Sequence, residues 1–254
     1  MFRDLYYTLF EFVRTFGALQ LFFMRLLWYT PAVLSRRFGL VVGQVHNAGA
    51  LSLVIIVICG FFVGAVLGLQ GFSNLSRFNA EDSVGAVAAL ALVKELGPVI
   101  TALLFAGRAG TALSSEIGLM KATDQLSAME MMAVNPVKRV LVPRFLGGVI
   151  SMPLLAGIFS AVGMFGAHLV GVELFQVDVG SFWQQIQLVA ESSDVNEGII
   201  KSVVFGFAAS VIAVWEGYNA IPTAEGVGRA TTRTVVITAI AILVFDFMIT
   251  AALI

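Results

Sequence analysis

The sequence predicts an all-α membrane protein: an amino-terminal interfacial helix and five transmembrane helices, with a short cytoplasmic helix between the second and third spans. Hydrophobic residues make up 59% of the 254 residues and charged residues only 12%, against roughly 25% charged in an ordinary soluble domain. Mean hydropathy is +0.94. The apolar residues also gather in runs long enough to cross a bilayer, which takes about 20 residues of helix.

The first segment is expected to lie in the membrane interface. Between Phe2 and Phe23, apolar residues recur at helical spacing, opposite a face that carries Arg3 and Arg14. This pattern is typical of interfacial amphipathic helices. Hydropathy alone would also allow residues 16–34 to form a sixth span, and amphipathicity favours the interfacial location. We expect no signal peptide, because no cleavage-site pattern follows an apolar region.

Five apolar segments follow, at residues 49–70, 83–107, 145–170, 198–215 and 234–254. Lysine and arginine gather before the first segment and in the connections after the second and the fourth, whereas the connection after the third is acidic. By the positive-inside rule, the amino terminus is cytoplasmic and the carboxy terminus lies on the other side. The chain is expected to form a single domain, with residues 1–45 as the interfacial region and 46–254 as the five-span bundle.

The first span contains two overlapping GxxxG steps, formed by Gly60, Gly64 and Gly68. Small residues at this spacing let two helices approach closely. The motif fits packing within the subunit or contact between subunits.

The second span is interrupted by the polar stretch LVKELGPVI, residues 92–100. A charge at this depth costs about 2.5–3.5 kcal/mol, and Lys94 and Glu95 point about 100° apart on a helix, so we expect them to have separate partners. Gly97 and Pro98 predict a helix break, because proline has no N–H to donate to the carbonyl of Lys94. The pair is either a structural ion pair at a kink or a source of polarity in a translocation cavity.

Two more charged residues fall in apolar spans. Lys201 enters the fourth span next to the acidic connection, so it either extends to the outer surface or faces a cavity. Asp246 lies near the middle of the fifth span. We expect a structural pairing for it, because no motif surrounds it.

The connection between the second and third spans predicts a short amphipathic helix. Thr123 is expected to cap it and Asp124 to lie in its first turn, and Asn135-Pro136 is expected to end it. A methionine-rich helical face suits docking in a groove of another protein, and a helix lying on the membrane is the alternative. The apolar face would consist of Leu126, Met129, Met132 and Ala133.

Several function classes lack their motifs. The sequence contains no GxxxxGK[ST] loop and no GxSxG motif, which predicts no catalytic residues and no nucleotide site in this chain. His46 and His168 have no companion at metal-ligand spacing, and the single cysteine, Cys59, cannot form an internal disulfide. A net charge of -1 gives no reason to expect a nucleic acid partner.

Three stretches closely resemble the MlaE-type permeases of bacterial ABC phospholipid transporters. They are KELGPVITALLFAGRAGTALSSEIGLMKATDQLSAMEMMAVNPVKRVLVPR at residues 94–144, IKSVVFGF at 200–207 and GYNAIPTAEGVGRATTRTVV at 217–236. The resemblance covers nearly the whole chain from about residue 45, and before that it rests chiefly on VRTFG around Arg14.

The resemblance implies a homodimeric inner-membrane permease that moves phospholipid and has no cofactor of its own. Two copies of a cytoplasmic ATPase would use ATP and Mg, each with a bound STAS-domain protein, and a ring of MCE-domain subunits would lie on the periplasmic face. The loop helix, Thr123 to Val134, corresponds to the coupling helix that enters the ATPase.

The resemblance also implies roles for particular residues, with Gly97 and Pro98 breaking the helix at the cavity. The implied lipid-cavity residues are Lys94, Glu95, Lys201, Leu67, Leu75 and Phe78. The implied ATPase-coupling residues are Thr123, Asp124, Gln125, Leu126, Met129, Glu130 and Met132.

Two other function classes compete with a non-enzymatic lipid permease. An ion-coupled secondary transporter would carry protons on Glu95 and Asp246 and would work without nucleotide. An intramembrane enzyme acting on lipid would need a catalytic pair at a common depth, and the sequence pattern does not predict one.

Overall fold

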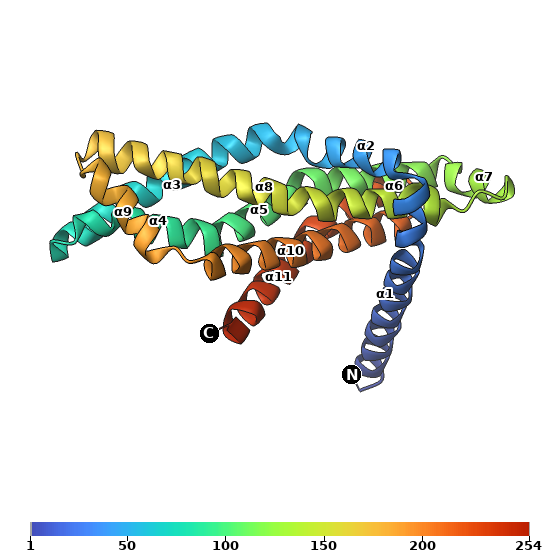
Figure 1. Cartoon of the computed structure of the whole chain (residues 1–254). Helices are drawn as coiled ribbons and strands as arrows, with labels where there is room; N and C mark the ends of the chain where they lie inside the picture. The colour runs from blue at the N-terminus through green and yellow to red at the C-terminus, as the bar shows by residue number, and fades with distance from the viewer. Residues whose placement is uncertain (1, 254) are drawn as a thin grey trace.

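A computed structural model describes residues 2–253, with side chains described for residues 17–35 and 37–253. The chain is 92% helical, and no strand occurs in the described range. Figure 1 shows an elongated bundle of helices that run side by side, with α1 projecting from one end. The predicted all-α class is therefore confirmed.

The first part of the chain forms one projecting helix and a bent pair of helices. An elbow between α2 and α3 contains a 3₁₀ turn, η1. The bounds are α1 (Phe2–Arg36), α2 (Phe38–Ala48), η1 (Ala50–Ser52), α3 (Leu53–Leu75) and a further 3₁₀ turn, η2 (Ser76–Phe78).

A continuous helical run of 42 residues, Glu81–Ala122, comes next. Two π segments interrupt its α-helical hydrogen bonding; such segments shift the faces of the helix that follows them. In order, the run consists of the 3₁₀ turn η3 (Glu81–Ser83), α4 (Val84–Leu90), the π segment η4 (Ala91–Leu96), α5 (Gly97–Phe105), the π segment η5 (Ala106–Gly110) and α6 (Thr111–Ala122).

The rest of the chain contains three long helices and two short ones. Helix α8 lies between α3 and α10 and contacts both, and α11 packs against α6 and α10. The bounds are α7 (Gln125–Met131), π segment η6 (Val137–Leu141), α8 (Val142–His168), π segment η7 (Leu169–Leu174), α9 (Val179–Val189), α10 (Ser192–Asn219) and α11 (Ala224–Leu253).

Five helical runs in the described residues are long and apolar enough to cross a membrane, as predicted: Phe38–Phe78, Glu81–Ala122, Val137–Leu174, Ser192–Asn219 and Ala224–Leu253. Each of the first four runs extends beyond its predicted bounds at both ends. Arg108 was predicted in the connection after the second span, but it lies within the helical run, in η5. The acidic residues Asp194 and Glu197, predicted in the outer connection, belong to α10.

Helix α1 is not among these five runs, although residues 16–34 were apolar enough to suggest a sixth. Its amino-terminal part points away from the bundle (Figure 1). Its later part packs against the bundle through Phe22, Leu26 and Val33. The side chains of residues 2–16, which carry most of the predicted amphipathic pattern, lie outside the described residues, so the interfacial location stays a prediction.

The GxxxG glycines pack within the subunit, which decides between the two interpretations of the motif. Gly60, Gly64 and Gly68 are buried on α3, and Cβ atoms there would collide with the backbone of α8 at Phe159, Gly163 and Ala167. Only glycine allows the two helices to approach this closely.

Three buried clusters follow one another along the bundle. The first joins α1, α7 and η6 to the nearby ends of α8 and α10. The second fills the middle around Phe105, Phe159 and Phe205. The third, built on Val84, Val172 and Phe182, holds α9 to the opposite end. These clusters define an α7 end and an α9 end of the bundle (Figure 1).

Candidate functional site

The polar stretch in the second span forms a π segment that helix α8 supports. The N–H of Gly97 donates to the carbonyl of Leu92, five residues back. The hydroxyl of Ser160 on α8 donates to the same carbonyl at 3.1 Å. The helix continues through Gly97 and Pro98, with the π pattern of η4 before them and α5 after them. The Ser160 side chain supports the carbonyl of Leu92, whereas the spare carbonyl had been expected at Lys94. A Cβ on Gly97 would collide with both Leu92 O and Ser160 Oγ.

Lys201 on α10 is the centre of a charge cluster at this π segment. Its side chain is 0% exposed, so it does not extend to the surface. Its Nζ donates to Glu95 Oε1 at 2.8 Å and to Thr250 Oγ1 at 2.8 Å, and lies 3.1 Å from Glu197 Oε1. Asp246 Oδ1 is 3.6 Å away. One ammonium group thus joins η4, α10 and α11.

Lys94 points to different partners from Glu95, as the angle between adjacent helical residues predicted. Its Nζ lies 3.1 Å from Asp194 Oδ1 and 3.2 Å from Glu197 Oε2. Asp194 also accepts the backbone N–H of Glu191 at 2.9 Å and so caps the start of α10. Glu197 bridges the two lysines, which makes the six charged residues one cluster.

The sequence of α11 explains why Asp246 and Thr250 reach this cluster. Residues four apart lie on one face of a helix, and the buried residues of α11 repeat at this spacing. Small side chains in its first half allow close packing against α6 and α10. The stripe consists of Gly226, Ala230, Thr234, Thr238, Ile242, Asp246 and Thr250.

The cluster contains more acidic than basic groups. Two lysines face four carboxylates, in a span where each charge needs compensation. The Glu95 side chain is 39% exposed, although its Oε1 accepts from the buried Lys201. The arrangement can offer polar contacts to a charged group that enters from the exposed side.

The other predicted lipid-cavity residues are not members of the Lys201 charge cluster. Leu67 packs against the middle hydrophobic cluster and Leu75 against the cluster at the α9 end. Phe78 is 79% exposed. A small cavity of about 210 Å³ borders the π segment, with Pro98, Ser160 and other residues of α8 and α10 in its wall. This volume is below the roughly 300–1,000 Å³ typical of ligand pockets.

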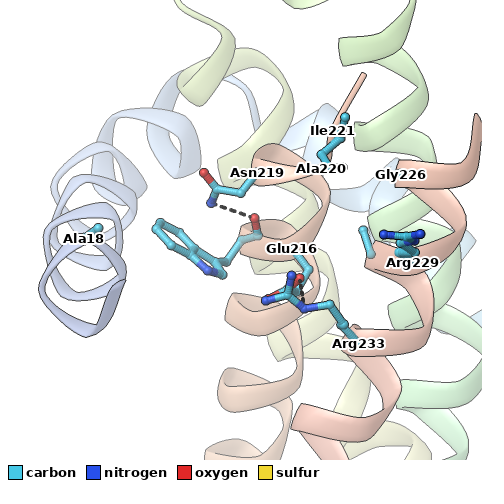
Figure 2. Close-up of a pocket in the computed structure, with 10 residues that line it drawn as sticks. Ala18, Glu216, Asn219, Ala220, Ile221, Gly226, Arg229 and Arg233 are labelled. Atoms are coloured by element: carbon cyan, nitrogen blue, oxygen red, sulfur yellow. Dashed lines mark hydrogen bonds and ion pairs between the residues drawn. The ribbon is translucent and has the colours of Figure 1, made fainter. Parts of the chain in front are cut away.

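A larger cavity, of about 690 Å³, lies at the α7 end between α1, α10 and α11. Figure 2 shows Glu216 and Arg233 paired across it, with 3.4 Å between Arg233 Nε and Glu216 Oε2. None of the residues described in its wall was predicted to bind lipid.

A short helix, α7, lies where a coupling helix was predicted, but it is shorter than predicted and starts differently. Asp124 precedes α7 in the left-handed conformation (φ 56°) and its side chain caps nothing, so it does not lie in the first turn. Thr123 does not cap α7 either, because its hydroxyl donates to Leu119 at the end of α6. The helix ends at Met131, before Asn135-Pro136.

The apolar face of α7 turns partly into the bundle. Leu126 is buried and Met129 packs against the cluster at the α7 end, so these two side chains anchor α7. Met131 is 84% exposed and Met132 67% exposed. The remaining members of the predicted coupling set, Gln125 and Glu130, are exposed.

Three members of the charge cluster were not predicted. Asp194 and Glu197 had been assigned to an acidic connection by charge alone, and the spacing of Glu197 and Lys201, four residues apart, was the missed signal. Thr250 lies four residues after Asp246 on the buried stripe. The contact of Thr250 with Lys201 and that of Asp194 with Lys94 require helices that are distant in sequence to meet.

Comparison with known proteins agrees with this architecture. Residues 41–252 match the family described as Permease MlaE. A Haemophilus influenzae protein named intermembrane phospholipid transport system permease protein MlaE is 54% identical over 85% of this chain and 83% of its own length. A probable ABC transporter permease protein of Rickettsia bellii is 38% identical over 84% of this chain and 82% of its own. The chain therefore belongs to the MlaE permease family, and its five apolar helices make it a multi-pass protein of the inner membrane.

Proposed function

We propose that this chain is the permease subunit of an ABC transporter that moves phospholipid between the inner membrane and a periplasmic MCE-domain partner. The observation that carries the proposal is the Lys201 cluster, which places fixed charges and an irregular backbone together inside the membrane. Irregular backbone at this depth is tolerated where it is buried in protein or lines a cavity. Glu95, Lys94 and Lys201 supply polarity for a headgroup that is costly to desolvate.

The lipid cavity forms between two copies of the chain. The cavity beside Pro98, at about 210 Å³, is too small for a ligand with two acyl tails. Helix α11 exposes apolar side chains on the face opposite its buried stripe, including Ile240, Leu243 and Phe247. In the proposed homodimer, the partner covers part of this face and closes the cavity.

ATP hydrolysis takes place in a separate ATPase that docks on α7. Exposed Met131 and Met132 suit an apolar groove, while Leu126 fixes α7 to the bundle. A STAS-domain protein would bind that ATPase. In this orientation the α7 end and the amino terminus are cytoplasmic, and the α9 end and the carboxy terminus are periplasmic.

The testing experiment isolates the complex from native membranes, identifies its chains and bound lipid, and then reconstitutes it in vesicles with labelled phospholipid. We expect an ATPase to co-purify and lipid transfer to require ATP. Glu95→Gln should assemble normally and transfer less lipid, and Glu95→Arg should be worse because it places a positive group against the ammonium group of Lys201. Normal transfer by a stably expressed Glu95→Arg variant would contradict the cavity role.

The docking part of the proposal has its own variant. Met131→Asp with Met132→Asp should release the ATPase without loss of the permease from the membrane, because both side chains are exposed. The matched control is Leu188→Asp, which introduces the same charge at an exposed apolar residue of α9, at the other end of the bundle. Retained ATPase binding by the double variant would reject α7 as the docking site.

A proton-coupled transporter is the second candidate, because Glu95 and Asp246 both lie near one ammonium group, that of Lys201. It predicts lipid movement by this chain alone in vesicles with a pH gradient. Movement without ATPase or nucleotide would favour this candidate over the ABC permease.

A further inference from the structure

Arg108 lies within the second span but takes no part in the Lys201 cluster. It lies in the π segment η5 and is half-buried. Its Nη1 donates to Asn47 O at 2.7 Å and to Ser52 Oγ at 3.1 Å. Both acceptors belong to the elbow between α2 and α3.

The elbow is a tight break with few ways to satisfy its polar groups. Helix α2 ends at Ala48, and the last carbonyls of a helix have no partner within it. The hydroxyl of Ser52, itself buried, donates to Ala48 O at 2.7 Å. Arg108 satisfies the neighbouring carbonyl of Asn47, and a cation at a helix carboxyl end is electrostatically favourable.

Helix α8 packs closely against one side of the elbow, at Gly49. A Cβ at Gly49 would come within 2.9 Å of Ser151 Oγ on α8, so the chain turns directly against α8. The guanidinium of Arg108 joins this elbow of the first span to the second run.

The second run connects the elbow to the Lys201 cluster and to α7. It carries Glu95 in η4 and ends at α6, which leads directly into α7. Helix α3, beyond the elbow, carries the predicted cavity residues Leu67 and Leu75. A displacement that begins at α7 would reach α3 through Arg108.

We propose that Arg108 is a positioning residue that holds the α2–α3 elbow to the second run, so that α3 follows movements transmitted from α7. This inference rests on the proposed function. Arginine suits the task because its guanidinium is planar, always charged and donates to two acceptors at once. A lysine at this position keeps the positive charge but lacks the planar guanidinium, so it should restore only part of the function of Arg108.

The test compares Arg108→Ala, Arg108→Lys and Ser52→Ala in the complex purified with its ATPase and reconstituted in vesicles with labelled phospholipid. Arg108→Ala should assemble and hydrolyse ATP at near wild-type levels, while the lipid transferred per ATP falls about tenfold. Arg108→Lys should recover part of this loss, and Ser52→Ala, which removes one of the two acceptors, should fall between Arg108→Ala and wild type. Arg229→Ala is the control, because Arg229 is exposed and pairs with Glu225 on its own helix.

A distance measurement makes the test independent of lipid transfer. Spin labels replace Leu51 in the elbow and Gly107 in η5, both exposed, in a Cys59→Ser background. The distance distribution should be narrow with Arg108 and broad with Arg108→Ala.

An unchanged distribution in Arg108→Ala would overturn the proposal, as would an equal fall of abundance, hydrolysis and transfer, which indicates a purely structural role. If the wild-type complex hydrolyses ATP but transfers no lipid, the proposed function fails, and the spin-label distances still decide whether Arg108 holds the elbow.

Discussion

The two π segments of the second run both carry charged side chains, but they use them differently. Lys94 and Glu95 of η4 meet charged partners on α10, whereas Arg108 of η5 meets a neutral carbonyl and a hydroxyl at the elbow. The first contact contains unequal numbers of acidic and basic groups, and Glu95 remains partly exposed. The second consists of two hydrogen bonds from Arg108 Nη1 to neutral acceptors.

This difference indicates a binding role for η4 and a structural, helix-connecting role for η5. Charges that remain partly exposed and incompletely balanced can interact with an incoming charged group. The hydrogen bonds of Arg108 instead fix the geometry of a helix end, although its guanidinium keeps its charge. Changes at η4 should therefore alter both stability and lipid handling, and changes at η5 should chiefly alter how movement is transmitted.

The largest expected effect comes from Lys201→Met, which removes the buried ammonium group. Glu95, Glu197 and Asp246 would then face one another without it, and breaking a buried ion pair costs about 3–5 kcal/mol. We expect a strong fall in membrane abundance and in the melting temperature of the purified protein. Lys94→Met is the control and should cost less, because its side chain is 34% exposed.

A double variant checks the physical reason. Adding Asp246→Asn to Lys201→Met should restore part of the lost stability, because it removes one uncompensated carboxylate from the cluster. A melting temperature of Lys201→Met equal to that of the wild type would show that the ammonium group does not hold the three helices together.

Matched glycine substitutions test the packing of the two π segments. Gly97→Ala places a methyl group against Leu92 O and Ser160 Oγ, and overpacking of this kind costs about 1–3 kcal/mol. Gly107→Ala in η5 meets no atom within 4 Å and should gain about 0.5–1 kcal/mol from better helix propensity. Thermal unfolding in detergent measures both. Equal melting temperatures for the two variants would refute the different packing of η4 and η5.

The smallest expected loss of stability is that of Thr250→Val, which removes one acceptor of Lys201. Glu95 and Glu197 still accept from the ammonium group, so the loss should be about 1 kcal/mol. Thr232→Val is the control, because its exposed hydroxyl donates only to Gly228 within α11. If Thr250→Val lowers the melting temperature as far as Lys201→Met does, the cluster depends on the hydroxyl far more than the distances suggest.

The hydropathy pattern predicted the class and the five spans, because the length of an apolar run follows from the thickness of the bilayer. It placed the boundaries less well. Arg108, Asp194 and Glu197 were assigned to connections because charged residues usually lie outside membranes, yet the structure gives each of them a partner inside a helical run.

The sequence by itself determined that Lys94 and Glu95 need separate partners and that helical hydrogen bonding is disturbed near them, because both follow from local helix geometry and from the missing N–H of Pro98. Only the tertiary structure decided which partners they have. Lys201, Asp246 and Thr250 lie on two other helices, and they meet Glu95 because α11 packs along its every-fourth-residue stripe. Such contacts depend on how helices cross in space, and local spacing within one helix carries no information about that crossing.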